Sequence, residues 1–184
     1  MAERDLIIKK LGPPDVDDIR RFRLVDDDDV GLRVFIRRDA RKSAAANLTQ
    51  TYVAKFDGDK KIVGYISIMC AEIKLEKTYQ IEDKEGADRY DYQPAVRISR
   101  LAVEDGQRGK RIGQQLVETA IGIVLLSIVP SVGCRFLILD AKQKSIDFYK
   151  KRGFRLLETH ENKSKATPLM FLDLRNHIDE TAPE

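Results

Sequence analysis

Residues 95–113 read AVRISRLAVEDGQRGKRIG and decide the fold. The alternating apolar residues of 95–103 predict a strand, and a long amphipathic helix over 112–129 follows the glycine-containing turn. A basic, glycine-rich turn that leads from a strand into a helix N-terminus favours phosphate binding, because the first-turn N–H groups lack partners and the helix dipole is positive there. The turn has neither Walker A spacing nor a G-x-G-x-x-G pattern, which disfavours ATP and dinucleotides. A plain glycine-containing loop remains the alternative. Three side chains would add positive charge: Arg108, Lys110 and Arg111.

The apolar pattern of the strand changes phase along its length. Val96 and Ile98 share one face, whereas Leu101 and Val103 fall on the other. A one-residue slip in a period-two pattern is what a β-bulge produces, and we expect one at residues 99–100. The bulge would free backbone groups that an extended, amide-bearing ligand could pair with. A strand that simply twists is the alternative.

The composition describes a globular protein with a highly charged surface. The chain has 184 residues, of which 42% are apolar and 34% charged, which excludes disorder of the whole chain. Its length predicts one domain over residues 1–184. The 33 basic residues against 30 acidic ones leave a net charge of only +3, too small to indicate nucleic-acid binding by itself.

Helical and strand patterns mix along the chain and predict an α/β (α+β) domain with a mixed central sheet, including the bulged strand, flanked by helices. Besides the strand and helix above, strands are expected at 6–11, 51–56, 62–73, 134–139, 154–157 and 169–174, and helices at 15–23, 30–46 and 143–152. Gly153 would close the last helix. The residues Asp57-Gly58-Asp59 predict a hairpin turn. Residues 74–93 are expected to form a long polar connection, and 175–184 a frayed tail.

Metal, disulfide and membrane chemistry are not indicated. Cys70 and Cys134 are far apart and form no C-x-x-C, so a disulfide framework or zinc site is not expected. The acidic run 26–29 lacks oxygen ligands at later calcium-loop positions, where Val30 and Arg37 stand, and is expected to be a solvated loop. No signal peptide or membrane-length apolar run is evident, so we expect a cytoplasmic protein without a metal.

Three segments together resemble the GNAT acetyltransferase family: RLAV at 100–103, RGKRIG at 108–113 and FYKKRGF at 148–154. The family pattern is a bulged strand, then Gln/Arg-x-x-Gly-x-Gly/Ala, then a later strand and a helix with F-Y-x-x-x-G-F. The match covers 94–154, about a third of the chain, in the family's order and spacing. Arg111 departs from it, because the pattern expects its first glycine there.

The resemblance implies acetyl-CoA as the acetyl donor. Strand backbone would pair with the pantetheine amides, the turn would wrap the pyrophosphate, and the start of the next helix would lie on the cofactor's other side. These positions are Leu101, Ala102 and Val103; Arg108, Gly109, Lys110, Arg111, Ile112, Gly113 and Gln114; and Ala141, Lys142 and Gln143.

Tyr149 is the expected catalytic residue, because a phenol can give a proton to the departing CoA thiolate. A core tyrosine with a satisfied hydroxyl is the alternative. No strong general base is evident: His160 is expected in a polar loop, His177 near the tail, and Glu72 is a weak candidate. A lysine amine with a pKa of about 10.4 needs a base, whereas an α-amine with a pKa of about 7.7–8.0 is already substantially neutral. We therefore favour an α-amino acceptor.

A finer resemblance is to the GNAT toxins of toxin–antitoxin pairs, which acetylate the α-amine of aminoacyl-tRNA and stop translation. It rests on 94–103 and on Asp140-Ala141-Lys142, and it implies an active-site role toward substrate for Arg100. It also implies charged tRNA, an antitoxin protein and a second copy of the chain as partners. Residues 135–155 hold seven basic residues against two acidic, and 33–42 five against one, which agrees with a phosphate-bearing partner. The alternatives are a small-molecule or protein-amine acetyltransferase and a non-catalytic CoA-binding regulator.

Overall fold

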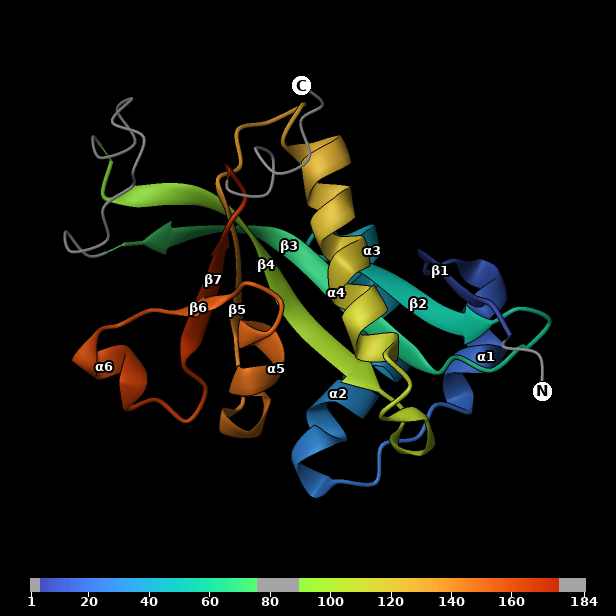
Figure 1. The fold of residues 1–184 in the computed structure, drawn as a ribbon. Coiled ribbons are helices and arrows are strands. Elements are labelled where there is room, and N and C mark those ends of the chain that lie inside the picture. Colours follow the sequence, from blue (N-terminus) through green and yellow to red (C-terminus); the bar gives the residue numbers. More distant parts are fainter. Residues whose placement is uncertain (1–3, 76–89, 176–184) are drawn as a thin grey trace. The chain divides into compact units, whose positions relative to one another are not determined.

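The computed structural model describes residues 4–75 and 90–175. Within these residues, seven strands form one sheet in the order β1-β2-β3-β4-β5-β7-β6, with helices flanking it (Figure 1). The expected mixed α/β class is confirmed. The chain divides into two compact units, residues 1–69 with 98–120 and residues 70–97 with 121–184. The expectation of one domain stays a prediction, and most of the 74–93 connection and of the tail lies outside the described residues.

The first unit is an antiparallel set of strands. Leu6 pairs with Phe56 and Lys10 with Tyr52, while Gln50 lies opposite Ile68. Its strands are β1 (Leu6–Lys10), β2 (Gln50–Phe56), the first part of β3 (Gly64–Lys74) and the last part of β4 (Tyr92–Val103). Its helices are η1 (Pro13–Asp15), α1 (Val16–Arg20), η2 (Asp27–Asp29), α2 (Val30–Val34), η3 (Phe35–Asp39), α3 (Ala40–Ala45), η5 (Asp105–Gln107) and most of α4 (Ile112–Ile123).

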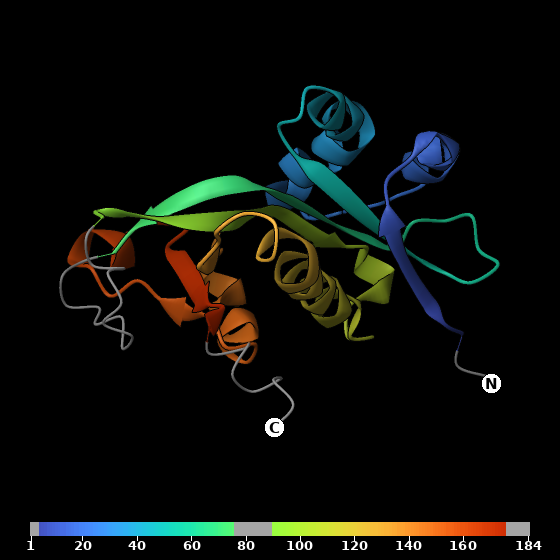
Figure 2. The same cartoon turned by 90° about the horizontal axis from the view of Figure 1, so that it is seen from above.

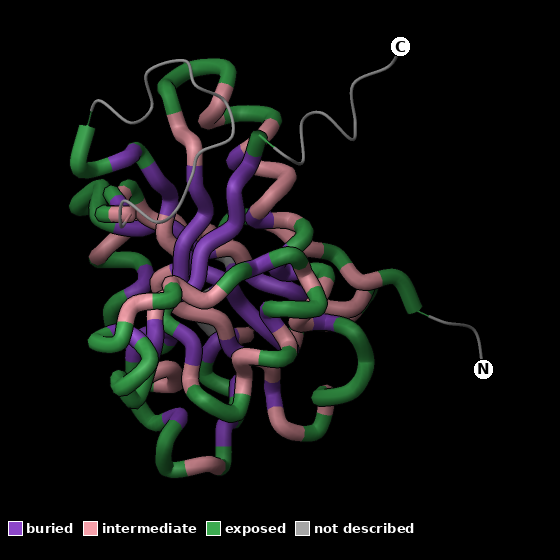
Figure 3. The backbone as a smooth tube through the Cα atoms, turned by 60° about the vertical axis from the view of Figure 1, so that its left-hand side comes forward, coloured by how far each residue is buried: buried purple, intermediate pink, exposed green. Residues whose placement is uncertain are grey.

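Helices cover both faces of these strands (Figure 2). On one face, α1, α2 and η3 pack their apolar side chains around the buried ring of Tyr65, next to Phe22 and Phe35. On the other, α4 comes so close to Gly64 that a Cβ there would lie 3.1 Å from side-chain atoms of Ile112 and Leu116. The amphipathic stripe of α4 is thereby confirmed as a sheet-packing face. Buried residues are drawn in purple in Figure 3.

The helical segment predicted over 30–46 exists, but its middle part, η3, is a π-helical turn. A regular helix over this segment would place Val34, Phe35 and Ala40 on the inside. Val34 is instead 37% exposed, and Ile36 is buried beside Phe35 and Ala40. The extra residue of the wide turn rotates the helix and so shifts the apolar face, which the 3.6-residue period did not predict.

The second unit combines antiparallel strands with short helices. Phe136 pairs with Asp173, and Arg155 on the short edge strand lies opposite Phe171. A charged pair supports the first of these pairings, because Arg135 contacts Asp173 through Nε–Oδ1 and Nη2–Oδ2 at 2.7 and 2.8 Å. Besides parts of β3 and β4, the unit contains η6 (Val124–Ile128), β5 (Phe136–Asp140), η7 (Gln143–Ser145), α5 (Ile146–Lys150), β6 (Arg155–Leu156), α6 (His160–Lys163) and β7 (Leu169–Asp173).

Two features of this unit bear on the sequence predictions. Gly153 has φ +83° and ends the α5 region as predicted, and a Cβ there would lie 3.2 Å from Leu172 Cδ1. The polar loop expected around His160 is wrong, because His160 begins helix α6. Thr159 caps that helix through the Asn162 N–H, and the buried Asn162 amide also bonds Leu157 and Leu169.

Candidate functional site

The C-terminal part of β4 combines buried and half-buried residues. Ala102 is buried in the first unit's core, whereas Leu101 and Val103 are half-buried. Ser99 Oγ donates to the carbonyl of Ser67 on β3 at 3.2 Å. The burial pattern of β4 changes phase at residues 95–96, which are both buried. The bulge expected at 99–100 stays a prediction.

Arg100 lies against η3 in the first unit. Its guanidinium lies 4.0 Å from the centroid of the Phe35 ring, a favourable cation–π arrangement. Phe35 stacks on Tyr65, with ring centroids 6.2 Å apart, and Tyr65 donates its hydroxyl to Leu32 O at 2.7 Å. Burial raises the pKa of Tyr65, and nearby Arg100 lowers it in part. The π-helical turn therefore supplies the ring that orients the arginine.

The turn after β4, which the sequence predicts to bind phosphate, contains two residues with positive φ. Gly109 has φ +83°, and Arg111 has φ +58°, the left-handed region that favours glycine. Arg111 stands where the family pattern places glycine, and its backbone adopts a conformation that glycine favours. The first hydrogen bond of α4 runs from Gln115 N to Arg111 O at 3.0 Å. The N–H groups of Ile112 and Gly113 precede it and belong to the turn without intrahelical acceptors.

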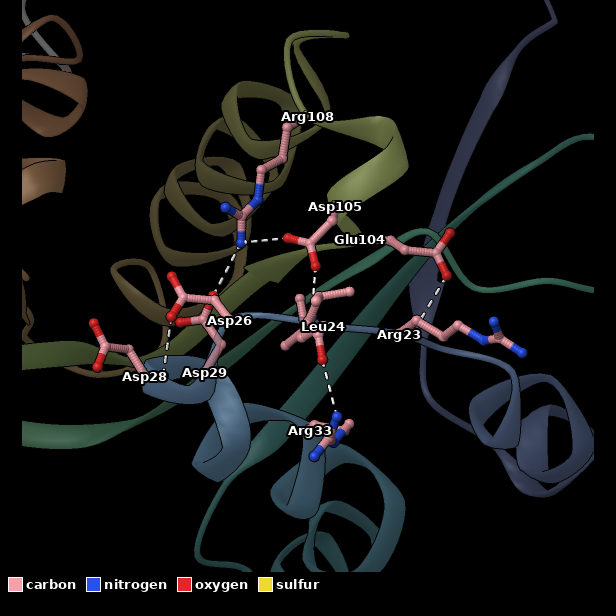
Figure 4. A network of polar contacts seen from close by, with 10 residues as sticks. Arg23, Leu24, Asp26, Asp28, Asp29, Arg33, Glu104, Asp105 and Arg108 are labelled. Carbon is pink, nitrogen blue, oxygen red and sulfur yellow. Dashed lines mark hydrogen bonds and ion pairs between the residues drawn. The ribbon is translucent and has the colours of Figure 1, made fainter.

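An acidic pair at the start of this turn bonds the backbone of a distant loop (Figure 4). The Arg23 N–H donates to Glu104 Oε1 at 3.2 Å, and the Val25 N–H donates to Asp105 Oδ2 at 2.5 Å. Glu104 is only 4% exposed and also pairs with Lys61 Nζ at 2.6 Å. No local sequence signal marks either acid, because the partners of both lie about eighty positions away in the chain.

The side chain of Arg108 is part of the same network. Its Nη2 lies 2.9 Å from Asp29 Oδ2 and 2.7 Å from Asp105 Oδ1. Asp29 is 6% exposed, so the solvated acidic loop expected at 26–29 is wrong for this residue. Burial of Asp29 depends on a cation from another segment, which the local acidic pattern does not reveal. The side chain of Lys110 donates to Gln107 Oε1 at 2.8 Å.

In the second unit, the residues expected along the cofactor follow β5. Ala141 is buried, and its N–H donates to Pro168 O at 2.9 Å. Lys142 is half-buried and Gln143 exposed; the Gln143 amide donates to Lys165 O at 3.0 Å. The segment 141–143 is thus tied to the loop before β7.

Tyr149 lies on α5 between two other aromatic rings. Its ring centroid lies 5.0 Å from that of Phe148 and 5.7 Å from that of Phe154, both edge-to-face. The residue is 8% exposed, and burial raises the pKa of Tyr149 to about 12, with Arg152 lowering it in part. Within the described part of its own unit, no hydrogen bond occupies the Tyr149 hydroxyl. A buried tyrosine in a structural role normally has such a partner, and the catalytic role of Tyr149 stays a prediction.

Metal-ligating side chains form no cluster among the described residues. Over 4–75 and 90–175, no group of three or more His, Cys, Asp or Glu side chains has metal-binding geometry. Glu72 is exposed near the end of β3, and His177 lies outside the described residues. No described helix has the length and apolar character needed to cross a membrane.

A family model described as an acetyltransferase (GNAT) domain matches residues 47–156, more than half of the chain. The chain therefore belongs to the GNAT family of acetyl-CoA-dependent N-acetyltransferases.

Among solved structures, the fold is similar to a tyrosine-to-phenylalanine mutant of KacT, with a TM-score of 0.79 and 20% identity over 98% of this chain and 100% of that one. It is also similar to AtaT complexed with acetyl-methionyl-tRNAfMet, with a TM-score of 0.76 and 20% identity over 97% and 100% of the two chains. An AtaT mutant toxin bound to acetyl-CoA and the C-terminus of the antitoxin AtaR gives a TM-score of 0.71 and 21% identity over 96% and 98%. These likenesses show a shared fold.

Proposed function

We propose that this protein is a toxin that transfers an acetyl group from acetyl-CoA to the α-amine of an aminoacyl-tRNA and so blocks translation. The observation that carries the acetyl-transfer chemistry is Tyr149, a buried phenol in the position of the family motif, whose hydroxyl has no hydrogen-bond partner in the described part of its unit. The choice of acceptor is supported by the shared fold with AtaT, which was solved with acetyl-methionyl-tRNAfMet.

The donor would be held by backbone groups of the first unit. Leu101, Ala102 and Val103 would pair with the pantetheine amides, and the turn from Arg108 to Gln114 would bind the pyrophosphate through its N–H groups. For Ala141, Lys142 and Gln143 of the second unit, a cofactor contact is proposed from the family resemblance alone. A Cβ at Gly109 would meet nothing within 4 Å, so the turn leaves open space for a bulky anion there.

Tyr149 would supply the proton that acetyl transfer requires. As the amine nitrogen forms its bond to the acetyl carbon, the C–S bond breaks and the thiolate, with a thiol pKa of about 8.5, accepts the Tyr149 proton. The amine loses one proton in the same transfer, which restores the phenol. Because its pKa is raised to about 12, Tyr149 is protonated throughout the neutral range and acts as a donor, never as the first base.

The acceptor amine then needs little help from the protein. An aminoacyl α-amine has a pKa of about 7.7–8.0, so a substantial fraction is neutral at physiological pH. We propose that Arg100, oriented by the Phe35 ring, contacts the acceptor. A lysine acceptor, with a pKa of about 10.4, would require a dedicated base.

Two basic surfaces support a phosphate-bearing acceptor. One lies on η3 and α3, where Arg38, Arg41 and Lys42 are exposed. The other lies on and after α5, where Lys150 and Lys151 are exposed. Arg33 and Arg37 of the first cluster are directed elsewhere: their guanidinium groups donate to Leu24 O and Phe22 O at 2.9 and 2.7 Å.

The test is to incubate the protein with labelled acetyl-CoA and separate pools of charged tRNA, free amines and proteins. We expect label in the charged tRNA, with tRNA affinity falling steeply as salt rises. Label confined to free amines or proteins, or tRNA binding indifferent to salt, would refute the acceptor assignment. A toxin role further predicts growth arrest on expression, relieved by an antitoxin encoded next to the gene.

A further inference from the structure

We propose that the Arg108 side chain is a positioning residue rather than a ligand of the cofactor. In this proposal, Arg108 and Asp29 form a brace that holds the phosphate-binding turn against the loop containing residues 23–29. The proposal rests on the acetyl-CoA binding proposed above and assigns the phosphate contacts to the backbone of the turn.

The charges around Arg108 argue against a ligand role. One nitrogen, Nη2, contacts carboxylate oxygens of both Asp29 and Asp105, at 2.9 and 2.7 Å. Two carboxylates against one guanidinium leave no net positive charge for a phosphate. The Asp29 side chain is only 8% exposed, so its charge is poorly solvated and depends on the guanidinium.

Three contacts tie the same two segments together (Figure 4). Besides the Arg108 pair, Glu104 and Asp105 each accept a hydrogen bond from the loop backbone, at Arg23 and Val25. A single pair with a half-exposed arginine stabilises little, whereas a connected network with a buried acid holds a backbone in place. The network therefore acts on the shape of the turn.

The turn needs such support because two of its residues are left-handed. Gly109 and Arg111 have φ +83° and +58°, and a non-glycine residue in this region persists only when its surroundings hold it. Backbone N–H groups bind phosphate well only when they already point at one place, since ordering them on binding weakens the affinity. The brace would keep the turn in its binding conformation.

The brace also connects the turn proposed to bind acetyl-CoA with the helical segment that carries Phe35, next to the proposed acceptor residue Arg100. Asp29 immediately precedes α2, and the helical segment continues into η3, where Phe35 lies under the Arg100 guanidinium. The loop that holds the turn thus continues into the helix that orients the proposed acceptor residue.

The experiment measures acetyl-CoA binding by calorimetry for the full chain and its Asp29→Asn, Arg108→Gln and double variants. Asp27→Asn is the matched control, because Asp27 is an exposed neighbour outside the network. Each single change should weaken binding about fivefold, equivalent to about 1 kcal/mol. The double variant should bind no more weakly than either single variant, and Asp27→Asn should bind like the wild type.

Acetyl-pantetheine, which lacks the phosphates, supplies the readout that separates positioning of the turn from general damage. Its binding, followed by ligand-observed NMR, should be unchanged in all variants. The proposal is wrong if Arg108→Gln weakens acetyl-CoA binding as strongly in the Asp29→Asn background as in the wild type, or if Asp29→Asn strengthens it; either result would make Arg108 a phosphate ligand. Equal weakening of both ligands would also overturn it. A wild-type protein that binds no acetyl-CoA would instead refute the proposed function.

Discussion

Replacing Arg111 by glycine should stabilise the protein slightly, although glycine usually destabilises. A left-handed residue with a side chain costs roughly 1–2 kcal/mol, and Arg111 at φ +58° carries this cost. Glycine removes it but adds roughly 0.5–1 kcal/mol of backbone entropy to the unfolded chain. The net gain in the free energy of unfolding is about 0.5 kcal/mol, or about 1–2 °C in Tm for a chain of this size.

Thermal and urea unfolding of Arg111→Gly, Arg111→Ala and Lys110→Gly would measure this effect. Alanine keeps the left-handed strain, so Arg111→Ala should unfold close to the wild type. Lys110 precedes Arg111 without a positive φ, so glycine there should bring the entropy loss, besides removing the exposed hydrogen bond to Gln107, and lower the stability by about 0.5–1 kcal/mol. Equal destabilisation by glycine at both positions would refute the reasoning that the turn strains Arg111.

Three further predictions concern the rest of the site. Gly153→Ala should destabilise the protein by more than Gly109→Ala. Both glycines have φ +83°, but only at Gly153 would the added methyl lie 3.2 Å from a leucine side chain of β7. Equal losses of unfolding free energy in urea would contradict this contact. Phe35→Leu should raise the KM for the acceptor several-fold without changing acetyl-CoA affinity. The reason is that the Arg100 guanidinium loses its aromatic partner, an interaction worth about 0.5–1 kcal/mol at a partly exposed site. An unchanged KM would show that Arg100 does not contact the acceptor. The pH profile of kcat/KM should rise with a midpoint near pH 8, the pKa of an α-amine, and then level off, with no fall attributable to Tyr149 below about pH 11, because burial raises the pKa of that phenol to about 12. A midpoint near pH 10 would indicate a lysine acceptor.

The succession of strands and major helices along the chain could be predicted from the sequence, because each of these elements has a local residue pattern. The hairpin turn, the stripe of α4 and the closing Gly153 all depend on residues within a few positions of each other. The π-helical turns at η3 and η6 could not be predicted this way, since they interrupt the regular period that the pattern assumes. Helix α6 was not predicted, because its four residues are polar and it depends on Thr159 and Asn162 rather than on an apolar face.

The candidate site was predictable where its residues belong to a contiguous motif and not where they act across the chain. The phosphate turn and Tyr149 both lie in such motifs. Glu104 and Asp29 have distant partners, and an acidic residue in a polar stretch is normally solvated, so nothing local distinguished them. The left-handed backbone of Arg111 was not predicted, because an arginine gives no local signal for a positive φ.

The most direct test of the account compares Tyr149→Phe with the wild type in two assays on the same preparations. The account predicts that acetyl-CoA binds both proteins with equal affinity by calorimetry, while the kcat for acetylation of charged tRNA falls about 100-fold or more in the variant, the usual contribution of a positioned proton donor. A variant that acetylates at the wild-type rate would contradict the account, because the buried phenol would then take no part in the chemistry.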